Sequence, residues 1–224
     1  MPRGAFIVID GTDGSGKATQ TKLLVERLRA EGKAVETISF PQYGQKSCGP
    51  VEEYLSGKYG SASDVGPYRA SVLYAVDRFD ASSKIQGWLD QGSVVVADRY
   101  VGSNMGHQGS KIADPEERKR FFDWEMHLEH DLFGIPRPDV NVVLHVPSAI
   151  SHELMKNRES KHGLKQDVHE QDPHHLRLAE EAYLDMTRQF ETFQLIECVE
   201  QGALLSPERV HDKVWSIVSP FFRS

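Results

Sequence analysis

"FIVIDGTDGSGKATQ", residues 6–20, changes character partway along its length. Its first four residues are apolar and mostly β-branched, which is typical of a strand buried on both faces of a sheet. Glycines at positions 11, 14 and 16 follow, and then a lysine at position 17. Beyond them Leu24, Val25 and Leu28 have the spacing of one helix face. A strand, a glycine-rich loop and a helix in this order predict a βα unit.

Four more apolar runs of strand length alternate with longer amphipathic segments. They are AVETISF (34–40), SVVVAD (93–98), VNVVLHV (140–146) and FQLIECV (193–199). Such alternation predicts an α/β fold in three layers, with a five-stranded parallel sheet between helices on both faces. We expect a single domain over residues 1–224.

Helices are expected between these runs. Their ranges are 17–32, 67–89, 121–132 and 175–190, and a last one begins at Pro207 behind Ser206. In the helix over 67–89, Leu73, Val76 and Ile85 are expected to face the core.

The composition is that of an ordinary globular protein, with 39% hydrophobic and 26% charged residues. A net charge of -7 argues against nucleic-acid and membrane-surface binding, because both partners are polyanions. The apolar run near the N-terminus is too short for a signal peptide or a membrane span, and Cys48 and Cys198 form no disulfide framework. We therefore expect a cytoplasmic protein that holds any anionic ligand with a local group of Lys and Arg side chains.

Residues 11–17, GTDGSGK, fit the pattern G-x-x-x-x-G-K of a phosphate-binding loop. The glycines let consecutive backbone N–H groups turn inward around a phosphate chain, and the following helix N-terminus adds its positive dipole end. Lys17 supplies a movable charge to the outer phosphates. The pattern predicts a nucleoside triphosphate site made of Gly11, Thr12, Asp13, Gly14, Ser15, Gly16, Lys17, Ala18 and Thr19.

The loop departs from its pattern at Ala18, where a Ser or Thr hydroxyl would ligate Mg²⁺. Thr19 lies about 100° further round the helix and cannot take the same position. The metal would then depend on phosphate oxygens, water and a carboxylate, for which Asp98 is the best-placed candidate. The missing hydroxyl also keeps open a nucleotide-binding module that has lost catalysis.

A second motif, DRYVGSN, begins at Asp98, at the carboxyl end of a buried strand, where doubly wound sheets place their ligands. Asp98 can hold Mg²⁺ or its water, and Arg99 can bridge two phosphates through its planar fork. A structural ion pair at the strand end is the alternative, and the neighbouring phosphate-binding loop makes it the weaker one.

With these motifs in their order, the chain resembles the thymidylate kinase family of P-loop nucleoside monophosphate kinases. The matching segments reach from residue 6 to about 183 and include GTDGSGK at 11–17, Phe40-Pro41-x-Tyr43, Leu73-Tyr74-Ala75-x-Asp77-Arg78, DRYVGSN at 98–104, Pro136-Arg137-Pro138-Asp139 and Lys165-x-Asp167-x-His169-Glu170. The resemblance implies the P-loop kinase fold and transfer of the γ-phosphoryl group of ATP to dTMP with Mg²⁺, giving ADP and dTDP. It also implies a homodimer, which is common in the family.

The resemblance assigns roles around the acceptor nucleotide. Asp13 faces the acceptor sugar and phosphate, Arg78 grips the acceptor phosphate, Arg99 reaches between the phosphates, Tyr74 stacks on thymine, Ser103 and Asn104 line the base and sugar pocket, and Phe40 and Tyr43 form further walls. The spacing agrees with part of this, because Tyr74 and Arg78 are four residues apart on one helical face. An acceptor phosphate is largely ionised at neutral pH and needs no general base, so catalysis reduces to aligning two anions and neutralising charge.

Residues 149–172 are almost wholly polar, which is typical of a lid or binding loop, here placed at about 156–172. A solvated helical hairpin is the alternative. Family members whose phosphate-binding loop lacks an arginine tend to carry the catalytic cation in the lid. The resemblance therefore implies Arg158 as a catalytic residue beside Lys17, Arg99 and Asp13, with Lys161 and Lys165 as further candidates.

Histidines raise two more questions. His107 stands where a tyrosine is frequent in the family and lies against the deoxyribose, so it either admits a 2'-hydroxyl or serves as a polar wall. The histidines at 162, 169, 174 and 175 fit no standard closed zinc site, and no cysteine lies near them.

A deoxynucleoside kinase is the rival enzyme on this scaffold. It would need a carboxylate base just beyond the first strand, a role open to Asp10. Tyr100 of the Asp-Arg-Tyr motif and Asp13 of the loop favour the monophosphate kinase.

Overall fold

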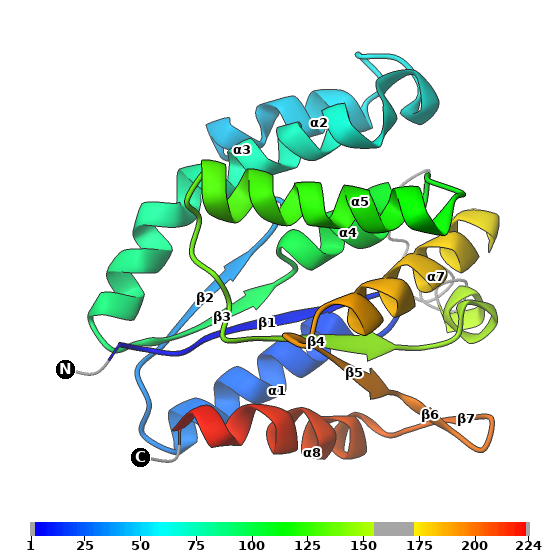
Figure 1. Ribbon diagram of the computed structural model, residues 1–224. Coiled ribbons are helices and arrows are strands. Elements are labelled where there is room, and N and C mark those ends of the chain that lie inside the picture. The colour runs from blue at the N-terminus through cyan, green and yellow to red at the C-terminus, as the bar shows by residue number, and fades with distance from the viewer. Residues whose placement is uncertain (1–2, 155–172, 223–224) are drawn as a thin grey trace.

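The computed structural model describes residues 3–154 and 173–222 of the chain. Its central sheet has five strands in the order β2-β3-β1-β4-β5, and every neighbouring pair is parallel (Figure 1). The strands are β1 (Phe6–Gly11), β2 (Val35–Ser39), β3 (Val94–Asp98), β4 (Val140–His145) and β5 (Phe193–Glu197). The expected five-stranded parallel sheet is therefore confirmed.

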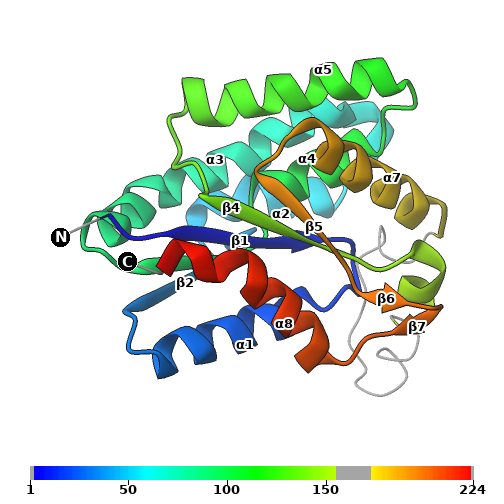
Figure 2. The same cartoon turned by 60° about the horizontal axis from the view of Figure 1, so that its bottom comes forward.

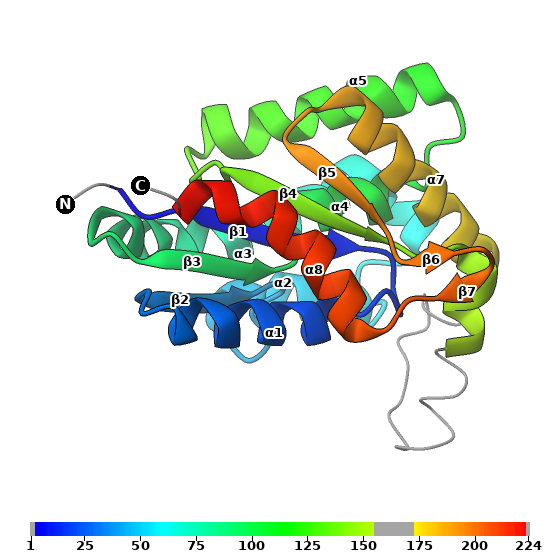
Figure 3. The same cartoon turned by 90° about the horizontal axis from the view of Figure 1, so that it is seen from below.

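Two layers of helices cover the sheet. Helices α1 (Lys17–Ala30) and α8 (Pro207–Val218) lie side by side on one face, which Figure 3 shows from below. The other face carries α3 (Ala62–Asp90), α4 (Val101–Gly109), α5 (Pro115–Met126) and α7 (Pro173–Gln189) (Figures 1 and 2). The shorter elements are η1 (Lys46–Cys48), α2 (Gly49–Leu55), the π-helical turn η2 (His127–Leu132), β6 (Val199–Glu200), β7 (Ala203–Leu204) and η3 (Ser219–Phe222), and residues 148–154 are also helical.

The apolar runs form strands because both faces of the sheet are buried. In β1, Phe6 and Val8 belong to the core under α3, α4, α5 and α7, whereas Ile7 and Ile9 belong to the core under α1 and α8. Alternate side chains of a strand point to opposite faces, so one continuous apolar run fills two cores.

Short polar side chains start several helices. Ser61 and Asp64 form a reciprocal capping box before α3, and Ser206 accepts a hydrogen bond from the backbone N–H of Arg209 at the start of α8. The start of α8 at Pro207 is thus confirmed. Helix α3 begins five residues before the expected Pro67, and its first turn is separated from the rest by Gly66, whose φ is 73°.

One prediction about the core is wrong. Ile85 of α3 is fully buried as expected, but the side chain of Val76 is 39% exposed. Val76 is exposed together with Tyr68, Val72 and Phe79 of the same helix. The spacing identifies an apolar helix face, but it does not reveal what covers that face.

The functional motifs meet at one edge of the sheet. In the β1–β3 ladder Ile9 pairs with Asp98, so the loops that follow the two strands leave the sheet side by side. The two chain ends lie at the opposite edge (Figure 1). Among the described helices, none is long and apolar enough to cross a membrane. Residues 155–172, which include the predicted lid, lie outside the described part.

Candidate active site

The glycine-rich loop runs from the end of β1 to the first turn of α1. Gly11 has a φ of 136°, and a Cβ atom there would lie 2.3 Å from the backbone oxygen of Leu144 in β4. Gly16, with a φ of 91°, is the N-cap of α1 and has no side chain that could cover the first turn. The helix N-terminus therefore presents its backbone N–H groups to the loop, which is the arrangement that binds phosphate.

Lys17 folds back over this loop. Its Nζ donates hydrogen bonds to the backbone oxygens of Gly11 (3.0 Å) and Thr12 (2.8 Å) and lies 3.5 Å from Oδ1 of Asp13. Burial lowers the pKa of Lys17 to about 8, and the nearby Arg99 acts in the same direction. The ammonium thus occupies the loop centre, where it can exchange backbone oxygens for phosphate oxygens.

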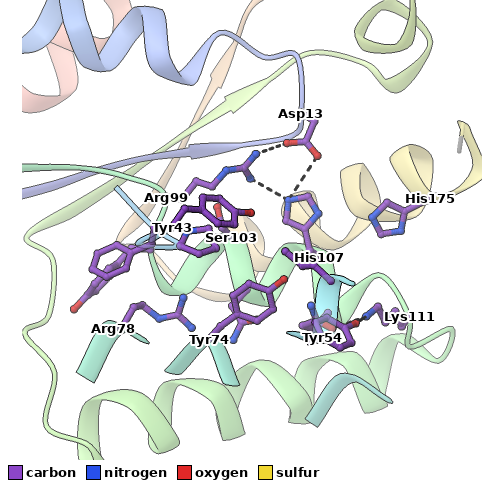
Figure 4. Close-up of a pocket in the computed structure, with 16 residues that line it drawn as sticks. Asp13, Tyr43, Tyr54, Tyr74, Arg78, Arg99, Ser103, His107, Lys111 and His175 are labelled. Carbon is purple, nitrogen blue, oxygen red and sulfur yellow. Dashed lines mark hydrogen bonds and ion pairs between the residues drawn. The ribbon is translucent and has the colours of Figure 1, made fainter. Parts of the chain in front are cut away.

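Asp13 connects the loop with Arg99. The guanidinium of Arg99 donates through Nη2 to Oδ1 of Asp13 and through Nη1 to Nε2 of His107, 3.2 Å away (Figure 4). Burial alone would raise the pKa of Asp13, but Arg99 and Lys17 outweigh burial and hold that pKa well below its usual range. Asp13 is therefore a carboxylate shared by two cations.

His107 is neutral in this cluster. Burial lowers its pKa to about 3, and the opposing effect of Asp13, 3.9 Å from Nε2, does not compensate. A neutral ring can accept the hydrogen bond from Arg99, whereas a protonated one could not. His107 also stacks on His175 of α7, with ring centroids 6.0 Å apart.

The backbone of Arg99 is strained. Its φ of 67° lies in the left-handed region, which costs a residue with a side chain roughly 1–3 kcal/mol. This residue joins β3 to α4, and the unusual turn aims its side chain across the sheet edge at Asp13 (Figure 4). The strain is thus located where two functional motifs meet.

A cavity of about 280 Å³ opens beside this cluster. Every residue predicted to bind the acceptor lines it: Asp13, Phe40, Tyr43, Tyr74, Arg78, Arg99, Ser103, Asn104 and His107. The structure brings these side chains together from four segments of the chain, and their individual roles stay predictions.

The cavity has aromatic walls and a polar floor. Tyr74 of α3 meets Tyr54 of α2 edge to face, with ring centroids 6.3 Å apart. Ser103 donates its hydroxyl proton to the buried Asp10 and accepts from Tyr183. Because Asp10 is fully buried, it is poorly placed to act as the base that a deoxynucleoside kinase requires.

Arg78 has a counter-ion that the sequence did not reveal. Its Nε donates to both carboxylate oxygens of Glu129, at 3.0 and 2.7 Å, and Nη2 donates to Oε1, with both residues buried. Arg99 also has a carboxylate partner, Asp13, but its side chain is 25% exposed, whereas that of Arg78 is 3% exposed and less accessible to a phosphate. The grip of Arg78 on the acceptor phosphate stays a prediction, and Glu129 argues against it.

Several residues that line the cavity were missed. Lys111 donates to the hydroxyl of Tyr54 (2.7 Å) and to Oε1 of Gln108 (2.6 Å), and burial lowers its pKa to about 8. His175 lines the same wall. Lys111 stands four residues after His107, and this helical spacing is the one signal that could have found it.

Asp98 lies where a Mg²⁺ ligand would be needed, beside the phosphate-binding loop. Its carboxylate is half-buried at the end of β3, and burial raises its pKa while Lys17 and Arg99 lower it. Ala18 and Thr19 are exposed at the start of α1. One partly buried carboxylate beside a phosphate-binding loop fits Mg²⁺, which commonly uses one or two carboxylates, water and substrate phosphates.

The phosphate-binding loop shares the carboxylate of Asp13 with the neighbouring cavity, at the carboxyl ends of the strands of a five-stranded parallel sheet. This arrangement defines a P-loop kinase. The thymidylate kinase family profile matches residues 9–213. The chain belongs to the thymidylate kinase family, whose members phosphorylate dTMP to dTDP. The resemblance found in the sequence is thus confirmed.

Known relatives agree with this assignment. A thymidylate kinase from Mycobacterium tuberculosis is 35% identical over 75% of this chain and 78% of that protein. The human thymidylate kinase is 31% identical over 69% of this chain and 70% of that protein. The solved structure of the Candida albicans thymidylate kinase shares the fold, with a TM-score of 0.73, 21% identity, and coverage of 97% of this chain and 92% of that one.

Proposed function

We propose that this chain transfers the γ-phosphoryl group of ATP to dTMP by aligning the two nucleotides across Asp13. The observation that carries the proposal is the shared carboxylate, since Asp13 belongs to the donor loop, lines the acceptor cavity, and contacts both Lys17 and Arg99. Donor and acceptor phosphates bound on its two sides would meet between two cations.

On the donor side, the loop N–H groups and Lys17 bind the ATP phosphates. On the acceptor side, Tyr74 and Phe40 hold the base, Tyr43, Ser103 and Asn104 complete the walls, and Arg99 binds the phosphate. The acceptor oxygen is already ionised, so the protein contributes positioning and charge neutralisation rather than proton abstraction.

Mg²⁺ is the proposed cofactor, held by Asp98, water and ATP oxygens in place of the hydroxyl that Ala18 lacks. When bound, it would neutralise charge on the donor phosphates. Arg158, with Lys161 and Lys165 as alternatives, is proposed to supply a further cation, although these residues lie outside the described part. Cytoplasmic location and the lack of nucleic-acid partners also stay predictions.

An ADP-release assay across acceptors tests the function. With ATP and Mg²⁺, we expect turnover of dTMP, weaker turnover of other nucleoside monophosphates, and none of thymidine, which lacks the phosphate that Arg99 binds. Ribothymidine monophosphate in the same series measures whether neutral His107 admits a 2'-hydroxyl. Turnover of thymidine but not of dTMP would refute the proposal, and tight binding of both nucleotides without turnover would favour a non-catalytic module.

The exposed face of α3 supports the proposed homodimer. An apolar stripe of four side chains, each 37% to 52% exposed, has helical spacing and consists of Tyr68, Val72, Val76 and Phe79. Phe79 also packs on Phe133, whose neighbour Leu132 is 66% exposed. Contiguous apolar surface of this kind commonly marks an interface, and a second copy of the chain can cover it through a twofold axis.

Val76→Glu is expected to convert the dimer to a monomer at micromolar concentration, because it places a charge in the middle of the stripe. Sedimentation velocity should show half the mass of the wild type. Ala30→Glu is the matched control, since it adds the same charge to an exposed residue of α1 on the opposite face of the sheet. A monomeric wild type, or a Val76→Glu protein that stays dimeric, would contradict the proposed interface.

A further inference from the structure

Behind the acceptor cavity lies a buried network of polar side chains, of which only Arg78 and Asn104 line the cavity itself. It comprises Ser71 and Arg78 of α3, Asn104 of α4, Glu125 of α5 and Glu129 of η2, none more than 4% exposed. Two carboxylic groups therefore lie near one guanidinium in a region closed to solvent. Charged groups are rarely buried without partners, so this arrangement needs an explanation.

The pairing within the network is unequal. Glu129 takes the bidentate contact with Arg78, whereas Glu125 accepts a hydrogen bond from Nδ2 of Asn104. Burial raises the pKa of Glu125, and the adjacent Glu129 raises it further, while Arg78 acts in the opposite direction. Glu129 is thus the carboxylate that neutralises Arg78, and Glu125 is held as a neutral acid.

Glu125 holds the side-chain amide of Asn104 from the side away from the cavity. Its Nδ2 uses both hydrogens on protein acceptors, one on Glu125 and one on the backbone oxygen of Ser71 at 3.4 Å. Within the described part of the chain, Oδ1 of the same amide has no hydrogen-bond partner, although the residue is 4% exposed and lines the cavity. A buried acceptor without a partner costs stability unless a ligand satisfies it.

We propose that Glu125 is a positioning residue for base selection, which orients the Asn104 amide so that its oxygen is reserved for a pyrimidine whose ring N3 carries a hydrogen. Thymine and uracil have this N–H donor, whereas N3 of cytosine is an acceptor and would leave two acceptors facing each other. The inference rests on the proposed function and adds to it the residue that sets the preference for dTMP over dCMP.

Glu125→Leu tests this directly, because leucine removes the acceptor that holds Nδ2 and frees the amide to rotate. We expect the KM and the Kd for dTMP to rise about 10-fold, kcat to change by less than about threefold, and the preference for dTMP over dCMP to fall. Glu125→Gln should restore all three, since its amide can accept from Asn104 and donate as the neutral acid does. A purely structural role would lower Tm while leaving Kd and base preference unchanged.

A double-mutant cycle distinguishes the positioning of Asn104 by Glu125 from a general packing effect. Because Glu125 acts through Asn104, adding Glu125→Leu to Asn104→Ala should raise the Kd for dTMP no further. An additional rise as large as in the wild-type background would overturn the inference. Calorimetric titration with dTMP gives this readout without turnover.

The pH dependence provides an independent measurement that needs no disruptive variant. Above the folded pKa of Glu125 the wild type acquires a second carboxylate beside Glu129, and both then compete for Arg78, with the other neighbours, Ser71 and Asn104, uncharged. The Kd for dTMP should therefore rise at alkaline pH in the wild type but less in Glu125→Gln. The ratio of the two Kd values at each pH cancels the titration of Lys17 and Lys111, and a constant ratio would refute a neutral Glu125.

The outcomes for the two proposals are distinguishable. Wild-type protein that neither binds nor phosphorylates dTMP would overturn the proposed function and this inference together. Wild-type protein that phosphorylates dTMP, with a Glu125→Leu variant of unchanged Kd and base preference, would overturn the inference alone.

Discussion

Arg99→Ala is expected to lower kcat for dTMP phosphorylation by about 10²- to 10³-fold, the usual effect of removing one cation that stabilises transition-state charge. The side chain joins Asp13 of the donor loop to the acceptor cavity. Its loss would therefore remove both the proposed phosphate ligand and the proposed alignment of the two halves of the site. The coupled ADP-release assay with saturating ATP and dTMP measures the change.

Two variants control for indirect effects. Arg99→Lys keeps the charge but loses the planar fork that bridges two phosphates, and it should fall between Arg99→Ala and the wild type. Arg209→Ala removes an exposed arginine paired with Glu200 on the far layer and should leave turnover unchanged. Wild-type kcat in Arg99→Ala would show that the shared carboxylate does not align the reaction.

The sheet could be predicted because each of its strands has a signal in a short run of neighbouring residues. Each strand is an apolar run, since both faces are buried, and the loop between β1 and α1 needs glycine where φ is positive and where a Cβ would strike Leu144. Among the elements that the sequence did not predict, the β6–β7 hairpin and α4 have no such pattern. The hairpin of β6 and β7 has two residues in each strand, and α4 includes three glycines, at positions 102, 106 and 109.

The sequence predicted which residues form the candidate site, but it did not predict which of their side chains pair with one another. The nine acceptor residues carried over from the family motifs all line one cavity. The contact between Arg78 and Glu129 spans 51 positions in the sequence and has no local signal. The exposure of Val76 could not be predicted either. Apolar residues have the same spacing on a helix face that packs against the core and on one that packs against a partner.

Lys17→Met is expected to lower kcat/KM for ATP by about 10³-fold, because methionine keeps the apolar stem but removes the charge from the centre of the loop. The same variant should be as stable as the wild type or more stable without ligand. The folded pKa of Lys17, about 8, lies below its ordinary value of 10.5. The buried charge therefore opposes folding in full below about pH 8, and this penalty disappears as the pH rises to 10.5.

Lys17→Met is thus expected to lose turnover without losing stability, and this combination distinguishes a ligand-binding role of Lys17 from a structural one. Binding of ATP raises the Tm of the wild type, since a ligand that binds only the folded state stabilises it, and in Lys17→Met that rise should shrink or vanish. Lys22→Met, on an exposed face of the same helix, should keep both the wild-type turnover and the ATP-dependent rise. If Lys17→Met loses activity and also melts well below the wild type without ligand, then Lys17 holds the loop together. In that case its buried charge is structural, and phosphate binding must depend on the backbone N–H groups.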